Sequence, residues 1–481
     1  MVAHPPERLS PHRVRNSLGN VTTTSATIAV SLDGRLFRFD GSSDSPFVPG
    51  GFVTLTQPDG RVQVGQVDAL EFAPSGELAG AGTVLAAITD DGSLDRRATA
   101  SFTSAELAPA DADTIGLVHS AAGAALSVGS LQSAEDIPAR LVPHRFNRHT
   151  FWCGQSGSGK TYALGVVLEQ LLVHAALPMV IFDPNADFVR MRELTNAGTP
   201  QERSALQERD IRILRPGRDA DSLHVRFTSL SLRAKAALLR LDPVADRIEY
   251  NALLRLEETV GSGDADAIIP RLRASDDEAA HALALRLENL RLVDWEVWAQ
   301  EHRAVTEILD ERPDATVLDL GGFSYADEQL VVAMAVLDDL WAKRESRRPI
   351  LIVIDEAHNL CSPDNDSPLH RAVRERIIQI AAEGRKFGLW LLLSTQRPSK
   401  IHPSIISQCD NLALMKMSSP LDLEELGTIF GFVPPSLLAR APRFRQGEVL
   451  FAGGFVAAPI LASMRTRLTV EGGVDVRVPL R

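Results

Sequence analysis

Residues 151–161 are the first segment of the chain in which side-chain types and spacing point to chemistry. The pattern G-x-x-x-x-G-K-[ST] runs from residue 154 to residue 161. Glycine tolerates positive φ angles, so backbone N–H groups of such a loop can converge on a phosphate, and the helix that follows adds the positive end of its dipole. The pattern favours a nucleotide-binding loop over an ordinary Gly/Ser turn. Its candidate ATP-binding residues are Gly154, Gln155, Ser156, Gly157, Ser158, Gly159, Lys160 and Thr161.

Two acidic residues that follow an apolar run form a second candidate group. The run 350–354 is typical of a strand buried on both faces, and α/β sheets bind ligands at the carboxyl edge of their strands. We expect Asp355 and the Thr161 hydroxyl to hold Mg²⁺, and Lys160 to contact the β- and γ-phosphates. Glu356 would polarise the attacking water. The alternative is a strand followed by an acidic helix cap.

Four more residues are candidates for the same site. Gln396 follows another apolar run and could sense the γ-phosphate, although a glutamine at a strand end is common. Arg148 and Arg385 each precede an expected strand; each could be an arginine finger or an ordinary surface ion-pair partner. Asp183 ends a third apolar run, where it could order a water or a metal ligand or simply begin a turn.

Length and composition limit the class of protein. At 481 residues the chain should fold as two or three domains. A hydrophobic content of 44% and a charged content of 23% are typical of a soluble globular protein. No apolar run approaches the ~18 residues of a membrane span, and no apolar signal segment is visible, so a cytoplasmic location is expected. The net charge of −12 argues against an outer surface that coats nucleic acid, but not against a basic channel.

Cysteine and histidine usage gives no indication of a metal centre. Cys153, Cys361 and Cys409 lack metal-type spacing, and we expect free thiols in a reducing cytosol. His149 and His358 are interpreted as structural, because no second ligand group has a matching spacing.

The pattern of apolar residues and turns changes along the chain, and this change predicts how the chain is divided into domains. Short apolar runs separated by Asp-Gly and Pro-Gly turns predict a small antiparallel β-barrel, whereas alternating strands and helices then predict an α/β fold with a mostly parallel sheet. The expected strands of that sheet are 150–153, 179–182, 211–214, 315–318, 350–354 and 389–394. The expected units are a flexible N-terminus (1–14), the barrel as a docking or assembly domain (15–128), a linker (129–147), a P-loop ATPase motor (148–446) and a β-rich C-terminal arm (447–481). The motor is expected to contain a helical insertion at about 229–303, which is interrupted at 261–263.

Together these motifs resemble the HerA–FtsK family of hexameric DNA-pumping ATPases, and the HerA branch most closely. The resemblance covers roughly residue 141 to the C-terminus, and it rests on the order of the segments 148–149, 154–161, 181–184, 317–320, 354–358, 383–388 and 394–398. It implies a RecA-like core and a six-membered ring with ATP at the subunit interfaces, where Arg148 and Arg385 would act. The N-terminal part resembles the small barrel that precedes the motor in that branch.

The resemblance also implies partners. HerA-type motors pass duplex DNA through a central pore and work with a nuclease or another effector, in DNA-end processing or anti-phage systems. We therefore expect a homo-hexamer, ATP and Mg²⁺, duplex DNA, a nuclease or sirtuin-like effector, and no membrane. Arg190 and Arg192 could line the pore or lie on a solvated surface. The alternative function is an ATP-dependent ring scaffold that licenses an effector with little DNA pumping; a membrane-associated conjugation motor is disfavoured.

Overall fold

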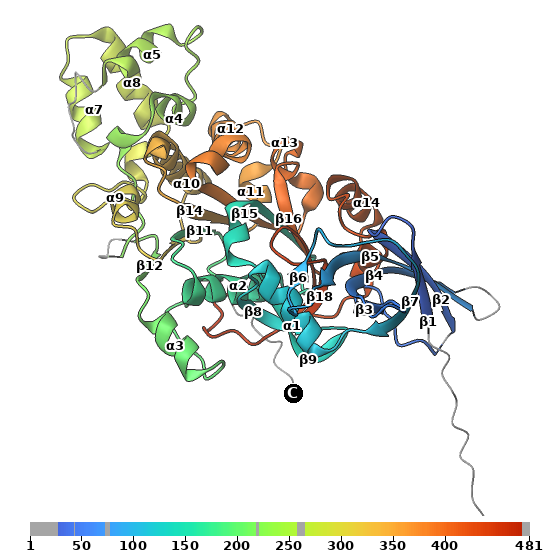
Figure 1. Cartoon of the computed structure of the whole chain (residues 1–481). Coiled ribbons are helices and arrows are strands. Elements are labelled where there is room, and N and C mark those ends of the chain that lie inside the picture. Colours follow the sequence, from blue (N-terminus) through green and yellow to red (C-terminus); the bar gives the residue numbers. More distant parts are fainter. Residues whose placement is uncertain (1–26, 43, 73–76, 218–220, 257–264, 474–481) are drawn as a thin grey trace, which may run out of the picture.

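The computed structural model describes residues 27–42, 44–72, 77–217, 221–256 and 265–473. Their strands form two sheets, a barrel near the N-terminus and a long sheet that runs through the rest of the chain (Figure 1). The expected flexible N-terminus at 1–14 and the expected interruption at 261–263 lie outside the described residues, as do the last residues of the C-terminal arm.

The N-terminal sheet is a closed antiparallel barrel, as the sequence predicts. Its order β2-β1-β7-β3-β4-β5 closes because β2 also pairs with β5, and β6 is attached to β5. Phe37 and Phe39 fill the interior opposite Gly82 and Gly80, where an added Cβ would lie 2.3 and 2.1 Å from the ring carbons. The strands are β1 (Thr27–Ser31), β2 (Leu36–Ser42), β3 (Phe52–Thr56), β4 (Val62–Phe72), β5 (Glu77–Ile88), β6 (Leu94–Asp95) and β7 (Phe102–Pro109).

The long sheet has the order β12-β13-β11-β14-β15-β10-β16-β17-β18-β8-β9. The strands from β12 to β16 in this order are parallel, and the others pair antiparallel. The strands are β8 (Leu126–Leu131), β9 (Ala134–Leu141), β10 (His149–Cys153), β11 (Met179–Asp183), β12 (Ile211–Leu214), β13 (Ala315–Asp319), β14 (Ile350–Ile354), β15 (Leu389–Thr395), β16 (Cys409–Leu414), β17 (Glu448–Gly453) and β18 (Ile460–Met464). The expected α/β fold with a mostly parallel sheet is confirmed.

The parallel strands are apolar on both faces because two cores enclose them. On β14, Ile350, Ile352 and Ile354 belong to one hydrophobic cluster, whereas Leu351 and Val353 belong to the other. Every residue of this strand is buried. Such two-sided burial explains the continuous apolar runs in the sequence and holds the ends of the strands at fixed positions.

The segment 129–147 is not the linker that we expected. It contains the end of β8 and all of β9, which extend the long sheet beyond β18. The strand pattern is hard to recognise because Gly129 and Pro138 interrupt it. Gly129 is required by the packing, since an added Cβ would lie 2.0 Å from the carbonyl oxygen of Ser463.

Helices α2 and α12 contact the long sheet, α1 and α15 contact strands of the barrel, and a group of helices forms the insertion between β12 and β13. The insertion lies at the end of the molecule remote from the barrel (Figure 1), and α4 of the insertion packs on α10 and α12 of the motor. The helices are α1 (Ala112–Ala122), α2 (Lys160–His174), α3 (Pro200–Gln207), α4 (Leu232–Leu238), α5 (Arg247–Leu254), α7 (Ala265–Arg273), α8 (Glu278–Asn289), α9 (Val305–Asp310), α10 (Ala326–Ala342), α11 (His358–Cys361), α12 (Pro368–Glu383), α13 (Pro403–Ile406), α14 (Pro420–Ile429) and α15 (Pro435–Leu438). Over the described part of the chain, none of the helices has the length and apolarity needed to cross a membrane.

Candidate nucleotide site

The loop between β10 and α2 has the backbone geometry of a phosphate-binding loop. Gly157 and Gly159 have φ angles of 77° and 84°, a region that glycine adopts without strain. The amide of Gln155 donates to the Lys416 carbonyl at 2.8 Å, and the amide of Gly447 donates to the Ser158 carbonyl at 3.0 Å. The loop is therefore held by the segments that follow β16 and precede β17.

Lys160 lies in a buried network at the carboxyl edge of the sheet. Its Nζ donates to Asp355 Oδ1 and to Ser394 Oγ, each at 2.8 Å, and lies 3.3 Å from Glu356 Oε1. Ser394 Oγ also donates to Asp355 Oδ1 at 2.6 Å. Burial acts to lower the pKa of Lys160, but the carboxylates of Asp355 and Glu356 outweigh burial and raise that pKa above its usual value. Ser394, on β15, has no role predicted from the sequence, but it contacts both the loop lysine and the carboxylate that follows β14.

Glu356 occupies a strained backbone position with its carboxylate held by three neighbours. Its φ angle is 43°, which a residue other than glycine rarely adopts. Gln396 Nε2 donates to Glu356 Oε1 at 2.7 Å, and His358 Nδ1 lies 3.3 Å from Oε2. Burial acts to raise the pKa of Glu356, but His358, Lys160 and Gln396 bring it to about 2. The structure thus brings Gln396 to Glu356, and also places His358, which we had interpreted as structural, against this carboxylate.

Asp183, at the end of β11, holds the loop that follows it. Its two carboxylate oxygens accept hydrogen bonds from the amides of Asp187 at 3.0 Å and Phe188 at 2.8 Å. Burial raises the pKa of Asp183 to about 6, despite these two amides. Burial and the charge of Asp183 likewise raise the pKa of Asp187 to about 7. These contacts favour the turn interpretation of Asp183, and Asp187 is a neighbour that the sequence pattern did not reveal.

The two candidate arginines lie at the opposite edge of the same sheet. Arg385 Nη1 contacts Asp410 Oδ2 at 2.6 Å, and Arg148 Nη1 lies 3.6 Å from the same oxygen. Arg148 precedes β10, whereas the phosphate loop follows it. Because β10 has five residues, the two edges lie roughly 15 Å apart at about 3.3 Å per residue. Within one chain, these arginines therefore do not contribute to the loop, and both side chains are partly exposed.

The remaining candidates have ordinary surroundings. His149 is buried, with Nε2 3.0 Å from the Ala381 carbonyl and Nδ1 accepting from the Leu391 amide at 2.9 Å. Arg190 pairs with Glu193, and Arg192 is exposed. The three cysteines are buried and free. No group of three or more His, Cys, Asp or Glu side chains that could hold a metal ion occurs in the described ranges.

Comparisons with known proteins agree with this geometry. Residues 126–339 match the family model described as "Helicase HerA, central domain". A probable helicase of Methanocaldococcus jannaschii is 23% identical over 380 residues, which cover 73% of this chain and 69% of that protein. A "DNA double-strand break repair helicase HerA" of Sulfurisphaera tokodaii is 33% identical over 117 residues, which cover 24% of this chain and 23% of that protein.

Among solved structures, VirB4 of Thermoanaerobacter pseudethanolicus matches with a TM-score of 0.49 and 14% identity, covering 72% of this chain and 97% of that one. The bacterial conjugative coupling protein TrwB matches with a TM-score of 0.46 and 14% identity, covering 72% of this chain and 92% of that one.

The fold and the loop define a P-loop NTPase, in which a parallel sheet presents a glycine-rich loop, a lysine and two acidic residues at one edge. The match over the central domain and the antiparallel barrel before it agree with the resemblance noted in the sequence: the chain is similar to HerA-type ATPases. The alignment with the Sulfurisphaera HerA helicase spans about a quarter of that protein, so it does not extend to the whole protein's activity.

Proposed function

We propose that this chain is the ATP-hydrolysing subunit of a hexameric ring that translocates duplex DNA and feeds or gates a partner nuclease or effector. The observation that supports the proposal best is the position of Arg148 and Arg385 at the edge of the sheet opposite the phosphate loop. In one copy of the chain, Arg148 and Arg385 lie away from its own phosphate loop, at the opposite edge of the sheet. In a ring, these two arginines would complete the phosphate site of the neighbouring copy.

The site fits ATP and Mg²⁺. Residues 154–161 would bind the triphosphate through their backbone amides, and Lys160 would leave Asp355 to reach the β- and γ-phosphates. Asp355 Oδ2 is buried without a hydrogen-bond partner in the described structure, which leaves an oxygen free for a cation or its bound water. Thr161 and Asp355 would hold Mg²⁺, which neutralises charge on the phosphates.

Glu356 is assigned as the base for the attacking water. The water oxygen would form a bond to the γ-phosphorus, the bond to the β–γ bridging oxygen would break, and Glu356 would accept the water proton. At a pKa of about 2 the carboxylate is ionised at neutral pH but is a weak base. Movement of Lys160 onto the phosphates would remove one of the charges that lower this pKa. Gln396 is assigned as the sensor because its amide already contacts Glu356.

The DNA and effector parts of the proposal rest on the relatives and on the barrel. Several relatives carry the name "DNA double-strand break repair helicase HerA", so DNA-end processing or anti-phage defence are the settings that we propose. The barrel exposes apolar side chains on β1 and β2, among them Ile28, Val30 and Leu36. Exposed apolar side chains on a small domain are consistent with a docking or assembly role.

The decisive experiment is complementation between two inactive variants. Lys160→Ala should not bind ATP but keeps its arginines, whereas the double variant Arg148→Ala/Arg385→Ala should bind ATP and lack the arginines. Each alone should be inactive, and mixed rings should recover DNA-stimulated hydrolysis at the interfaces where a functional loop meets functional arginines. Arg371→Ala, at another partly exposed arginine, is the matched control and should keep full activity.

The outcomes separate the proposal from its alternatives. If a monomer with ATP and Mg²⁺ hydrolyses at the full rate, or if the double arginine variant stays active, the shared site is wrong. If mixed rings recover activity but duplex DNA does not stimulate it with or without the effector, the ring is the scaffold of the alternative function.

A further inference from the structure

His358 is the first residue of α11, and its imidazole lies against the assigned base, Glu356. The Nδ1 atom of His358 is 3.3 Å from Glu356 Oε2 and forms a hydrogen bond of 3.2 Å with the hydroxyl of Thr395. The side chain of Glu356 is 7% exposed, and that of His358 is 21% exposed. The imidazole therefore joins the base to the last residue of β15.

The two carboxylate oxygens of Glu356 have different surroundings. Oε1 lies on the side of the phosphate loop, 3.3 Å from Lys160 Nζ, and it accepts from Gln396 Nε2 at 2.7 Å. Oε2 is buried, and no group in the described structure forms a well-aligned hydrogen bond with it. A buried carboxylate oxygen without a donor is unfavourable, and His358 Nδ1 is placed to supply one.

The backbone keeps Glu356 and His358 at fixed relative positions. Glu356 has a left-handed φ angle of 43°, and such a conformation persists only where the surrounding contacts determine it. The amide of Ala357 donates to the Ser394 carbonyl, and the amide of Asn359 donates to the Glu356 carbonyl, each at 2.8 Å. The turn between β14 and α11 is thereby attached to β15.

Two buried histidines of the chain show what a structural histidine looks like here. Both ring nitrogens of His149 bond to backbone groups, and His370 Nε2 lies 2.6 Å from the Asn359 carbonyl. The ring of His358, by contrast, contacts the side chains of the assigned base and of β15. This difference favours a role in the nucleotide site over the structural role expected from the sequence.

We propose that His358 is a positioning residue for Glu356. Its Nδ1–H would donate to Oε2, so that Oε1 faces the attacking water and the γ-phosphate. The contact of 3.3 Å would shorten when ATP is bound, since hydrogen bonds at catalytic sites are often long before the substrate binds. The proposal rests on the proposed function, because it takes Glu356 as the base.

Thr395 would hold the imidazole in this orientation. Its Oγ1 accepts from the Arg397 amide at 3.0 Å, and a hydroxyl oxygen has a second acceptor site that can share the Nδ1–H of His358. The end of β15 would then act on both oxygens of the base, on Oε1 directly through Gln396 and on Oε2 through His358. A carboxylate held at both oxygens keeps one orientation, whereas one held at a single oxygen can rotate.

The test compares two substitutions of similar size in the full chain. His358→Leu removes the donor, and we expect the kcat of ATP hydrolysis to fall by about 10- to 100-fold, as misplacement of a reacting group does, with the Kd for ATP unchanged. His358→Asn places an amide N–H near the position of Nδ1, because both side chains branch at Cγ, and it should recover most of the lost kcat.

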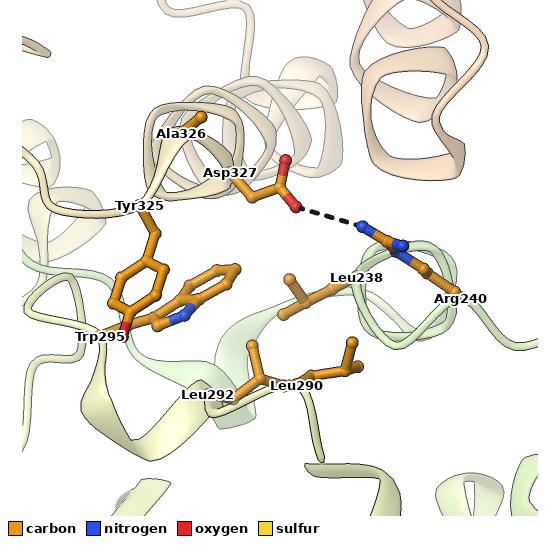
Figure 2. A pocket seen from close by; sticks show the side chains of 8 residues that line it. All are labelled: Leu238, Arg240, Leu290, Leu292, Trp295, Tyr325, Ala326 and Asp327. Atoms are coloured by element: carbon orange, nitrogen blue, oxygen red, sulfur yellow. Dashed lines mark ion pairs between the residues drawn. The ribbon is translucent and has the colours of Figure 1, made fainter. Parts of the chain in front are cut away.

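The control is a substitution in the motor away from the nucleotide site. Asp327, in α10, forms an ion pair of 3.9 Å with Arg240 of the helical insertion (Figure 2). Asp327→Asn weakens this exposed pair and should leave both kcat and the Kd for ATP unchanged.

A positioning role that acts through Glu356 also predicts non-additivity. In the Glu356→Gln background, His358→Leu should not lower the single-turnover rate further, because residues that act as a unit are not additive. A further loss in the double variant would assign His358 a structural role and overturn the proposal.

The remaining outcomes separate the proposal from the proposed function. If Glu356→Gln is inactive while His358→Leu keeps its full kcat, the positioning role is wrong and the proposed function is unaffected. If Glu356→Gln keeps full turnover, the assigned base is wrong, and the positioning role is rejected with it. If His358→Asn is as slow as His358→Leu, a donor at this position is not sufficient, and the assigned role of Nδ1–H is wrong.

Discussion

The surroundings of a buried ion pair between α2 and the C-terminal segment predict different losses of stability when one partner or the other is substituted. Arg467 Nε lies 3.1 Å from Glu169 Oε1, and both side chains are 1% exposed. Glu169 also accepts from the amides of Leu468 at 2.7 Å and Thr469 at 3.1 Å, and from the Thr469 hydroxyl at 2.5 Å. Arg467 has fewer partners: besides Glu169 it contacts Thr469 Oγ1 and the Phe188 ring, and its Nη1 has none in the described structure.

The partners that remain after each substitution set the expected magnitude. Removing one member of a buried pair typically costs about 3–5 kcal/mol, because an uncompensated charge stays in the interior. Glu169→Gln leaves the Arg467 charge without a carboxylate, and we expect the full loss of about 4 kcal/mol. Arg467→Met leaves a carboxylate that keeps three donors, so a loss of about 2 kcal/mol is expected. The double variant buries no charge and should lose only about 1 kcal/mol, since replacing a whole buried pair is often nearly neutral.

The assay combines urea unfolding with hydrogen exchange of the α2 amides. The ion pair holds α2, which begins at Lys160, so a local loss of stability should appear first as faster amide exchange in this helix. Glu311→Gln, at the exposed pair with Arg303, is the control and should change stability by less than about 0.5 kcal/mol. The reasoning is refuted if Arg467→Met destabilises as much as Glu169→Gln. It is equally refuted if the two single losses simply add in the double variant, since coupled groups in contact should not be additive.

Three further predictions concern the nucleotide site and the sheet. Burial holds the pKa of His149 at about 4, below its usual 6.5. The neutral imidazole therefore stabilises the fold above pH 6.5, and this stabilisation is lost as the pH falls from 6.5 to 4. The apparent melting temperature should drop across this window, and it should drop by less in His149→Gln. Glu356→Gln should bind ATP normally in a filter assay but lower turnover by about 10²–10⁴-fold, the usual contribution of a general base, and full turnover would reject the assigned role. Gly159→Ala should weaken ATP binding, measured by calorimetry, because alanine disfavours the φ of 84° found there, whereas equal binding would show that the loop tolerates the change.

The sequence was sufficient to locate the strands that form the centre of the motor. The expected strand 150–153 is β10 (His149–Cys153), and the expected strands 350–354 and 211–214 agree with β14 and β12 at both ends. β10 and β14 are buried on both faces, which explains their continuous apolar runs, whereas β12 lies at the edge of the sheet and is only partly buried. The N-terminal barrel was recognisable for another reason, because its turns contain Asp-Gly and Pro-Gly pairs.

Features that depend on distant contacts could not be predicted. Ser394 contacts Lys160 across 234 positions of the chain, and Arg467 meets Glu169 across 298. No local pattern distinguishes these residues from ordinary serine or arginine. The extra strands β8 and β9 were missed because they contain few apolar residues and because their pairing depends on a distant segment. β8 pairs with β18, far along the chain, and β9 pairs with β8.

The same few strands connect the two halves of the proposed shared site. β10 begins just after Arg148 and ends at the phosphate loop, and β15 begins shortly after Arg385 and ends just before Gln396. The two strands pair in parallel along four residues. A close-packed sheet transmits small displacements along its strands rather than absorbing them, because its interior has little free volume. In the proposed ring, a shift of Gln396 on loss of the γ-phosphate would therefore move Arg385 in the same subunit, so that hydrolysis at one interface is sensed at the next without a hinge.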